Sequence, residues 1–156
     1  MIALEVLGIR LAAPEDSPVL LLQEVSGTRC LPIWIGSVEA AAIAIAIDPH
    51  TEVTRPMTHD LLGSVISLLA EGSGGQVVIT DMRDGVYSAE LRIDETVVDC
   101  RPSDGVALAL RLGWPVQCSA QLMDRIGVEL DEMPSDEVEQ FRAFLDSVSA
   151  EDFESE

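Results

Sequence analysis

An internal repeat constrains the fold more than any other feature of this sequence. The letters EAAAIAI at residues 39–45 resemble DGVALAL at residues 104–110. Three apolar, β-branched runs precede each stretch, at 2–11, 19–24 and 29–35 in the first half and at 76–82, 86–93 and 96–100 in the second. This shared order predicts an internal duplication, although a chance similarity of two Ala-rich helices is the alternative over so short a match.

Helices are predicted at 37–47, 58–71, 103–112 and 119–126, with Ser37, Thr58 and Ser103 as N-caps. The helix at 37–47 is apolar on all sides, because Ile43 and Ile47 share one face and Ile45 points nearly opposite. We expect other elements to cover it on both sides. The fold class that follows is α+β, an internally duplicated strand meander plus helices, with a mixed or antiparallel sheet.

The length of 156 residues and a hydrophobic content of 47% suit one substantial core. We expect one domain over residues 1–128 and a separate acidic segment over 129–156. That segment is predicted to hold a helix at 134–149, with apolar residues at helical spacing, and a disordered end at 150–156. The helix at 37–47, which is apolar on all sides, suggests that the domain leaves one apolar face uncovered. We expect this face to form the contact of a homo-oligomer.

The charge balance argues against long-range attraction of nucleic acid. Nine basic residues, all of them Arg, stand against 28 acidic residues, which gives a net charge of -19. Residues 129–156 hold 11 of those acids and one Arg. A field of this sign repels polyanions, so a nucleic-acid role requires a local Arg site or a bound cation. The absence of Lys excludes catalysis by Lys.

The cysteines and the apolar runs indicate a cytoplasmic protein. Cys30, Cys100 and Cys118 lack the spacing of a disulfide framework or a zinc site and are expected to pack as small hydrophobic residues. The N-terminus shows no basic leader before an apolar stretch. The longest apolar stretch, 31–47, is too short and interrupted to span a bilayer, so no membrane association is expected.

Two helix starts repeat an unusual local design, RPMTHD at 55–60 and RPSD at 101–104. Proline stiffens the backbone from which Arg55 and Arg101 project, and a helix N-terminus favours anions, so a phosphate fits there. Hard oxygen ligands for Mg²⁺ or Mn²⁺ are available in three acidic side chains, Asp60, Asp99 and Asp104.

A purely structural interpretation of these two corners is also open. Hydroxyl side chains often cap helices, acids are stabilised at helix starts, and each Arg can pair with a nearby acid. His59 adds weight to the first corner, because an imidazole beside an acid suits proton transfer near neutral pH. His50 follows Asp48 and Pro49 in a loop, and we assign it no role.

Three motifs in matching order give the sequence a resemblance to a known family. They are LPIWIG at 31–36 with EA at 39–40, RPMTHDL at 55–61, and DCRPSD at 99–104 with ALA at 107–109. Over residues 2–126 the chain resembles the bifunctional nuclease domain. The resemblance implies an α+β domain whose members are credited with cutting RNA and DNA. The sequence departs from the family pattern at Gly105, where Ala is usual, and in its acidic C-terminal segment.

The residue chemistry yields a hypothesis for such an activity. A divalent cation, Mg²⁺ or Mn²⁺, would be held by Asp60, Asp99 or Asp104 and would polarise a phosphodiester and activate water. Arg55 and Arg101 would stabilise the developing charge, and His59 would act as base or as acid for the leaving group. The alternative is a non-enzymatic oligomeric interaction module whose acidic tail binds a basic partner.

Overall fold

A computed structural model of the chain describes residues 1–11 and 17–130. Its eight strands form one mixed sheet in the order β6-β5-β4-β7-β1-β2-β3-β8. The strands are β1 (Ile2–Arg10), β2 (Val19–Glu24), β3 (Arg29–Trp34), β4 (Gly75–Arg83), β5 (Val86–Ile93), β6 (Thr96–Cys100), β7 (Val116–Cys118) and β8 (Val128–Glu129). The helices are α1 (Ser37–Ile47), α2 (Thr58–Leu69), α3 (Pro102–Leu112) and α4 (Ala120–Ile126).

The two halves repeat the same arrangement, as the sequence predicted. The strands β1, β2 and β3 form an antiparallel meander that leads into α1, and β4, β5 and β6 form a second meander that leads into α3. Strand β7 lies between the meanders, parallel to β4 and antiparallel to β1. The predicted α+β class with a mixed sheet is therefore confirmed.

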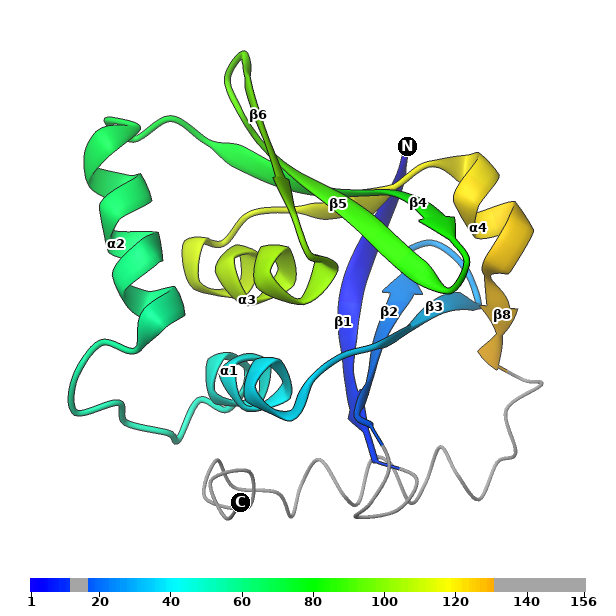
Figure 1. The fold of residues 1–156 in the computed structure, drawn as a ribbon, viewed down its shortest axis with the longest axis horizontal. Coiled ribbons are helices and arrows are strands. Elements are labelled where there is room, and N and C mark those ends of the chain that lie inside the picture. The colour runs from blue at the N-terminus through cyan, green and yellow to red at the C-terminus, as the bar shows by residue number, and fades with distance from the viewer. Residues whose placement is uncertain (12–16, 131–156) are drawn as a thin grey trace.

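The helices α1 and α3 lie side by side, and α2 runs across their ends (Figure 1). Ile43 and Ile45 of α1 are both buried, which confirms that the centre of this helix is covered on two sides. Gly105 lets α3 approach the sheet, because a Cβ atom there would lie 2.8 Å from Cγ1 of Val77. The hydroxyl of Tyr87 donates a hydrogen bond of 2.8 Å to the carbonyl of Pro32 and so links the two halves.

All three predicted N-caps were wrong, by one or two residues. The helices α1, α2 and α3 are capped by Gly36, Met57 and Arg101, without a capping hydroxyl. At α3 the reason is Pro102, whose fixed φ suits the first helical position and moves the start of the helix ahead of Ser103. Ser119 does cap α4, and its hydroxyl accepts a hydrogen bond of 3.1 Å from the backbone N–H of Leu122.

The apolar spacing in α2 predicts the helix correctly, but most of its large apolar residues do not face the core. Leu61, Leu62, Val65, Leu68 and Leu69 are exposed. The side that packs inward holds Ile66, the one large apolar residue of α2 that contacts the core, together with His59, Gly63 and Ala70. The small residue at Gly63 allows α2 to pack closely against α3, since a Cβ atom on Gly63 would lie 3.7 Å from Cδ2 of Leu112.

Two helical glycines give opposite predictions for stability. Gly63→Ala is expected to raise the free energy of unfolding by about 0.5–1 kcal/mol, because the added methyl group fits and Ala favours helix. Gly105→Ala is expected to lower it by about 1–2 kcal/mol, because the methyl group would collide with Val77. Urea unfolding followed by circular dichroism measures both. Equal effects of the two substitutions would contradict the packing described for α3.

The remaining sequence predictions concern the cysteines, membranes and the C-terminal segment. All three cysteines are free thiols, and burial raises the pKa values of Cys100 and Cys118 to about 11. Within residues 1–11 and 17–130, no helix has the length and apolar character needed to cross a membrane. The helix predicted at 134–149 and the disordered end predicted at 150–156 lie outside the described residues.

Candidate functional site

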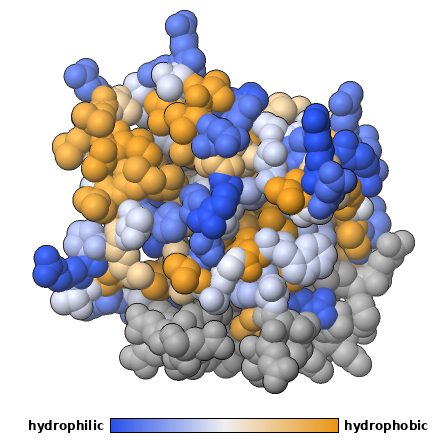
Figure 2. Space-filling view, in the orientation of Figure 1, coloured by the Kyte–Doolittle hydropathy of each residue, from blue (hydrophilic) through white to orange (hydrophobic). Residues whose placement is uncertain are grey.

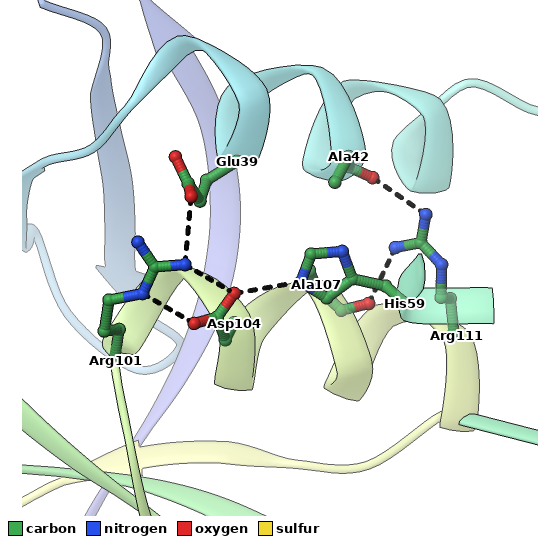
Figure 3. Close-up of polar contacts among 7 residues, drawn as sticks. All are labelled: Glu39, Ala42, His59, Arg101, Asp104, Ala107 and Arg111. Carbon is green, nitrogen blue, oxygen red and sulfur yellow. Dashed lines mark hydrogen bonds and ion pairs between the residues drawn. The ribbon is translucent and has the colours of Figure 1, made fainter. Parts of the chain in front are cut away.

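The N-terminal turns of α2 and α3 meet through the side chains of His59 and Asp104 (Figure 3). Nε2 of His59, in the first turn of α2, lies 3.0 Å from Oδ1 of Asp104, in the first turn of α3. The His59 side chain is 14% exposed, and 45 positions of sequence separate it from Asp104. The contact therefore depends on the tertiary packing of α2 against α3.

Arg101 stands at the open side of this contact. Its Nε donates to Oδ2 of Asp104 at 2.7 Å, and its Nη2 donates to Oδ1 of Asp104 at 3.1 Å and to Oε1 of Glu39 at 2.9 Å. The side chain is nevertheless 64% exposed. Its Nη1 forms no hydrogen bond with another residue of the described ranges, so this nitrogen is free to contact a ligand.

A second ion pair, which no local sequence pattern indicates, lies deeper between the helices. Nε of Arg111 donates to Oδ1 of Asp60 at 2.6 Å, and the Arg111 side chain is only 10% exposed. Its Nη1 and Nη2 donate to the carbonyls of Ala107 and Ala42, at 2.8 and 3.1 Å. Arg111 thus joins α1, α2 and α3 through Ala42, Asp60 and Ala107, and Figure 3 shows its bonds to Ala42 and Ala107.

Both site carboxylates are held in the ionised form. Burial by itself raises the pKa of Asp104, but hydrogen bonds from Arg101 and His59 outweigh it and bring the pKa below its usual 3.8. Burial likewise opposes ionisation of Asp60, and hydrogen bonds from Arg111 and from the backbone N–H of Met57 bring its pKa below the usual value. An ionised Asp104 only accepts hydrogen bonds, so Nε2 of His59 is the donor. The lone pair of neutral His59 is then on Nδ1.

Two predicted site residues do not join this cluster. Arg55 is exposed in the loop before α2 and forms no ion pair with any residue of 1–11 or 17–130. Asp99 is exposed on β6, where it lies opposite Glu90. Its neighbour Cys100 faces Gly105 in α3, and side chains alternate along a strand, so Asp99 points to the other face of the sheet.

The cluster carries a surplus of negative charge. Two guanidinium groups, of Arg101 and Arg111, face the carboxylates of Glu39, Asp60 and Asp104, so the net charge is one negative unit while His59 is neutral. Every oxygen of Asp60 and Asp104 already accepts a hydrogen bond. Within the described part of the chain, no three or more His, Cys, Asp or Glu side chains are placed to hold a metal ion. A divalent cation bound to Asp104 would compete with Arg101 for this carboxylate.

Comparison with known proteins agrees with the motif resemblance. The model of the bifunctional nuclease domain matches residues 20–131, a range that includes both corners, and the chain belongs to this family. Two proteins of Mycobacterium tuberculosis are each 44% identical to the chain over 160 residues, which covers 96% of both sequences. They are MT1877 of strain CDC 1551 / Oshkosh and Rv1829 of strain H37Rv, and both are named as uncharacterized.

Proposed function

We propose that this protein is a nuclease that hydrolyses phosphodiester bonds of RNA and DNA at the start of α2 and α3. The family description supports a nuclease, and one observation carries the assignment of the site. That observation is the hydrogen bond between His59 and Asp104 beside the exposed guanidinium of Arg101. A histidine oriented by a carboxylate, next to a cation, has the parts needed for acid–base catalysis on a phosphate ester.

In the proposed reaction, Arg101 binds a non-bridging oxygen of the phosphodiester through its Nη1. A water molecule attacks phosphorus, and Nδ1 of His59 accepts the proton that the water loses. The P–O bond to the leaving oxygen breaks, and that oxygen takes a proton from solvent or from the imidazolium. Asp104 stabilises the positive charge that forms on His59 and keeps Nε2 as the donor. Since water is the nucleophile, a 2′-hydroxyl is not required, and both RNA and DNA are substrates.

In this proposal Arg55 contacts the substrate outside the cluster of His59, Asp104 and Arg101. It is exposed and lies four residues before His59, at the entrance to α2. Its guanidinium would offset the surplus negative charge of the cluster and contact a neighbouring phosphate of the substrate. Asp60 has no direct contact with the substrate in this proposal. Its carboxylate accepts hydrogen bonds from Arg111 and from the backbone N–H of Met57, and it therefore positions the start of α2.

Assistance by Mg²⁺ or Mn²⁺ stays a separate prediction. A cation near Asp104 and Glu39 would reverse the surplus negative charge, but it would have to replace Arg101 as the partner of these carboxylates. The proposed reaction uses no metal ion in any step. Cleavage that is lost in EDTA and restored by Mn²⁺ would establish the requirement, and cleavage that persists in EDTA would exclude it.

The test of the proposed function is cleavage of fluorescently labelled single-stranded RNA and DNA by the purified full chain. Assays run in EDTA, Mg²⁺ and Mn²⁺, with ion-exchange purification to remove contaminating nucleases. We expect both substrates to be cut. Absence of cleavage in every condition would contradict the proposal and favour the interaction module, in which the acidic residues 129–156 bind a basic partner.

A further inference from the structure

Strand β4 and helix α4 meet at one acidic side chain, Asp81. Oδ2 of Asp81 accepts a hydrogen bond of 2.7 Å from Nε of Arg83, and Oδ1 accepts one of 2.5 Å from Nη2 of Arg125. We call these three residues the β4–α4 cluster. In Figure 1, α4 lies beside the end of β4, and Figure 2 shows hydrophilic residues gathered at the same place, at the upper right of the view. The β4–α4 cluster shares no residue with the contacts around His59.

The β4–α4 cluster carries a surplus of positive charge. Hydrogen bonds from Arg125, Arg83 and the backbone N–H of Met82 hold the pKa of Asp81 well below its usual 3.8, so Asp81 is ionised. Two guanidinium groups therefore share one carboxylate, and the net charge is one positive unit. In other ion pairs of the described residues the carboxylates equal or outnumber the guanidinium groups. These are the pairs of Arg29, Arg92, Arg101 and Arg111.

Asp81 holds both arginines in place and leaves part of each guanidinium open. Nη1 and Nη2 of Arg83, and Nε and Nη1 of Arg125, form no hydrogen bond with another residue of the described ranges. The two side chains are 87% and 53% exposed. One arginine is enough to neutralise Asp81, so pairing with this carboxylate does not account for the second.

We propose that Arg83 and Arg125 form a second phosphate-binding site. Each guanidinium can donate to a different oxygen of one phosphate group, because Asp81 fixes both groups around one point. The phosphate would come from the backbone of a nucleic-acid strand or from a free phosphate ion. In the first case the site rests on the proposed nuclease function and holds the strand outside the reacting phosphate. In the second case it is independent of that function.

The charge balance of the chain favours the nucleic-acid strand. A protein with a net charge of -19 repels a polyanion, so a bound strand requires local positive charge. Arg101 cannot supply a surplus, because Glu39 and Asp104 both accept from it. The β4–α4 cluster supplies the positive surplus that the cluster around His59 lacks.

The test is binding of two probes to the full chain at several salt concentrations. One is a single-stranded phosphorothioate oligonucleotide, which keeps the backbone charge and resists cleavage, and the other is inorganic phosphate. NMR of the arginine Nε groups reports where each probe binds, and we expect saturable shifts at Arg83 and Arg125. Arg125→Gln is expected to raise the Kd of the oligonucleotide by about 10-fold. It should also reduce the slope of log Kd against log salt by about 0.7, because one phosphate contact is lost.

Three further variants make the test specific. Arg92→Gln is the matched control, because it removes one positive charge from a pair with Glu90 outside the cluster, and it should change the Kd by less than about 2-fold. Asp84→Asn removes the acid that follows Arg83 and should tighten binding by about 2-fold, since asparagine tolerates the left-handed φ of 51° at this position. Arg83→Gln replaces Arg125→Gln if that variant folds poorly.

The outcomes separate the two sources of phosphate. A larger loss of oligonucleotide affinity in Arg125→Gln than in Arg92→Gln identifies the strand as the ligand. Shifts of Arg83 and Arg125 with inorganic phosphate, but equal oligonucleotide affinities of the two variants, identify free phosphate. Absence of shifts at both arginines with either probe would overturn the proposal. The signal of Arg101 in the same spectra tests the proposed nuclease site, so failure of that site is distinguishable from failure of this one.

Discussion

Replacing His59 with glutamine is expected to slow oligonucleotide cleavage by about 10²- to 10⁴-fold, the range typical for loss of a general base. The amide of glutamine can still donate a hydrogen bond to Asp104, so the start of α2 and the ion pair of Arg101 should be retained. Glutamine cannot accept the proton that the attacking water loses. The measurement is the initial rate of cleavage of labelled RNA and DNA at saturating substrate.

The chain supplies a matched control for this substitution. His50 is the second of its two histidines, and it is exposed in the loop after α1. His50→Gln removes the same chemical group and should leave the cleavage rate unchanged. Equal rates for His59→Gln and the wild-type protein would mean that His59 is not the base, or that a contaminating nuclease performs the cleavage. Preparing all three proteins in parallel separates these outcomes, because a contaminant varies between preparations and not with the substitution.

Replacing Arg111 with methionine is expected to lower the free energy of unfolding by about 3 kcal/mol, the low end for breaking a buried ion pair. Methionine keeps an apolar stem of similar length, but it leaves Asp60 without its cation and the carbonyls of Ala42 and Ala107 without a donor. The low end applies because the Asp60 carboxylate retains some access to water. Arg92→Met is the control, since its pair with Glu90 is more exposed and should contribute less than about 1 kcal/mol.

The effect of Arg111→Met should depend on pH. The pKa of Asp60 lies below its usual 3.8 in the folded chain, so its ionised form contributes stability above that usual value. This contribution is lost as the pH falls through the folded pKa. The stability difference between wild-type protein and Arg111→Met should therefore shrink below about pH 4, measured by urea unfolding at several pH values. A difference that is constant down to pH 3 would indicate that packing of the Arg111 stem, and not the charge pair, supplies the stability.

Local patterns in the sequence were sufficient for most elements of the fold. The predicted bounds of α1, β2 and β6 agree with the structure, because β-branched runs, turn residues and an Ala-rich helix act over a few neighbouring residues. The central strand β7 was missed. Its three residues are too few to show a period, and they become a strand only because β1 and β4 lie on either side.

For the candidate site, the sequence indicated the residues that belong to local motifs, but not the contacts between residues that are distant along the chain. The two Arg-Pro corners are local motifs, and the structure brings His59 of the first corner to Asp104 of the second, while Arg55 stays outside the cluster. The pair of Arg111 and Asp60 joins residues 51 positions apart, so no local spacing indicates it. One signal was available, since Arg111 is the only charged residue between Asp104 and the end of α3. The alternation of side chains along β6 also separates Asp99 from the helix starts.

The most direct test of the account is whether a phosphodiester binds at His59 and Arg101. Titration of the labelled protein with a short phosphorothioate oligonucleotide, followed by NMR of the imidazole and guanidinium nitrogens, measures this contact. We predict saturable shifts at His59 and at Nε of Arg101, with His50 unchanged, and no shifts with an uncharged methylphosphonate oligonucleotide. Saturable binding that leaves the His59 and Arg101 signals in place would contradict the account, because the substrate phosphate would then lie elsewhere on the molecule.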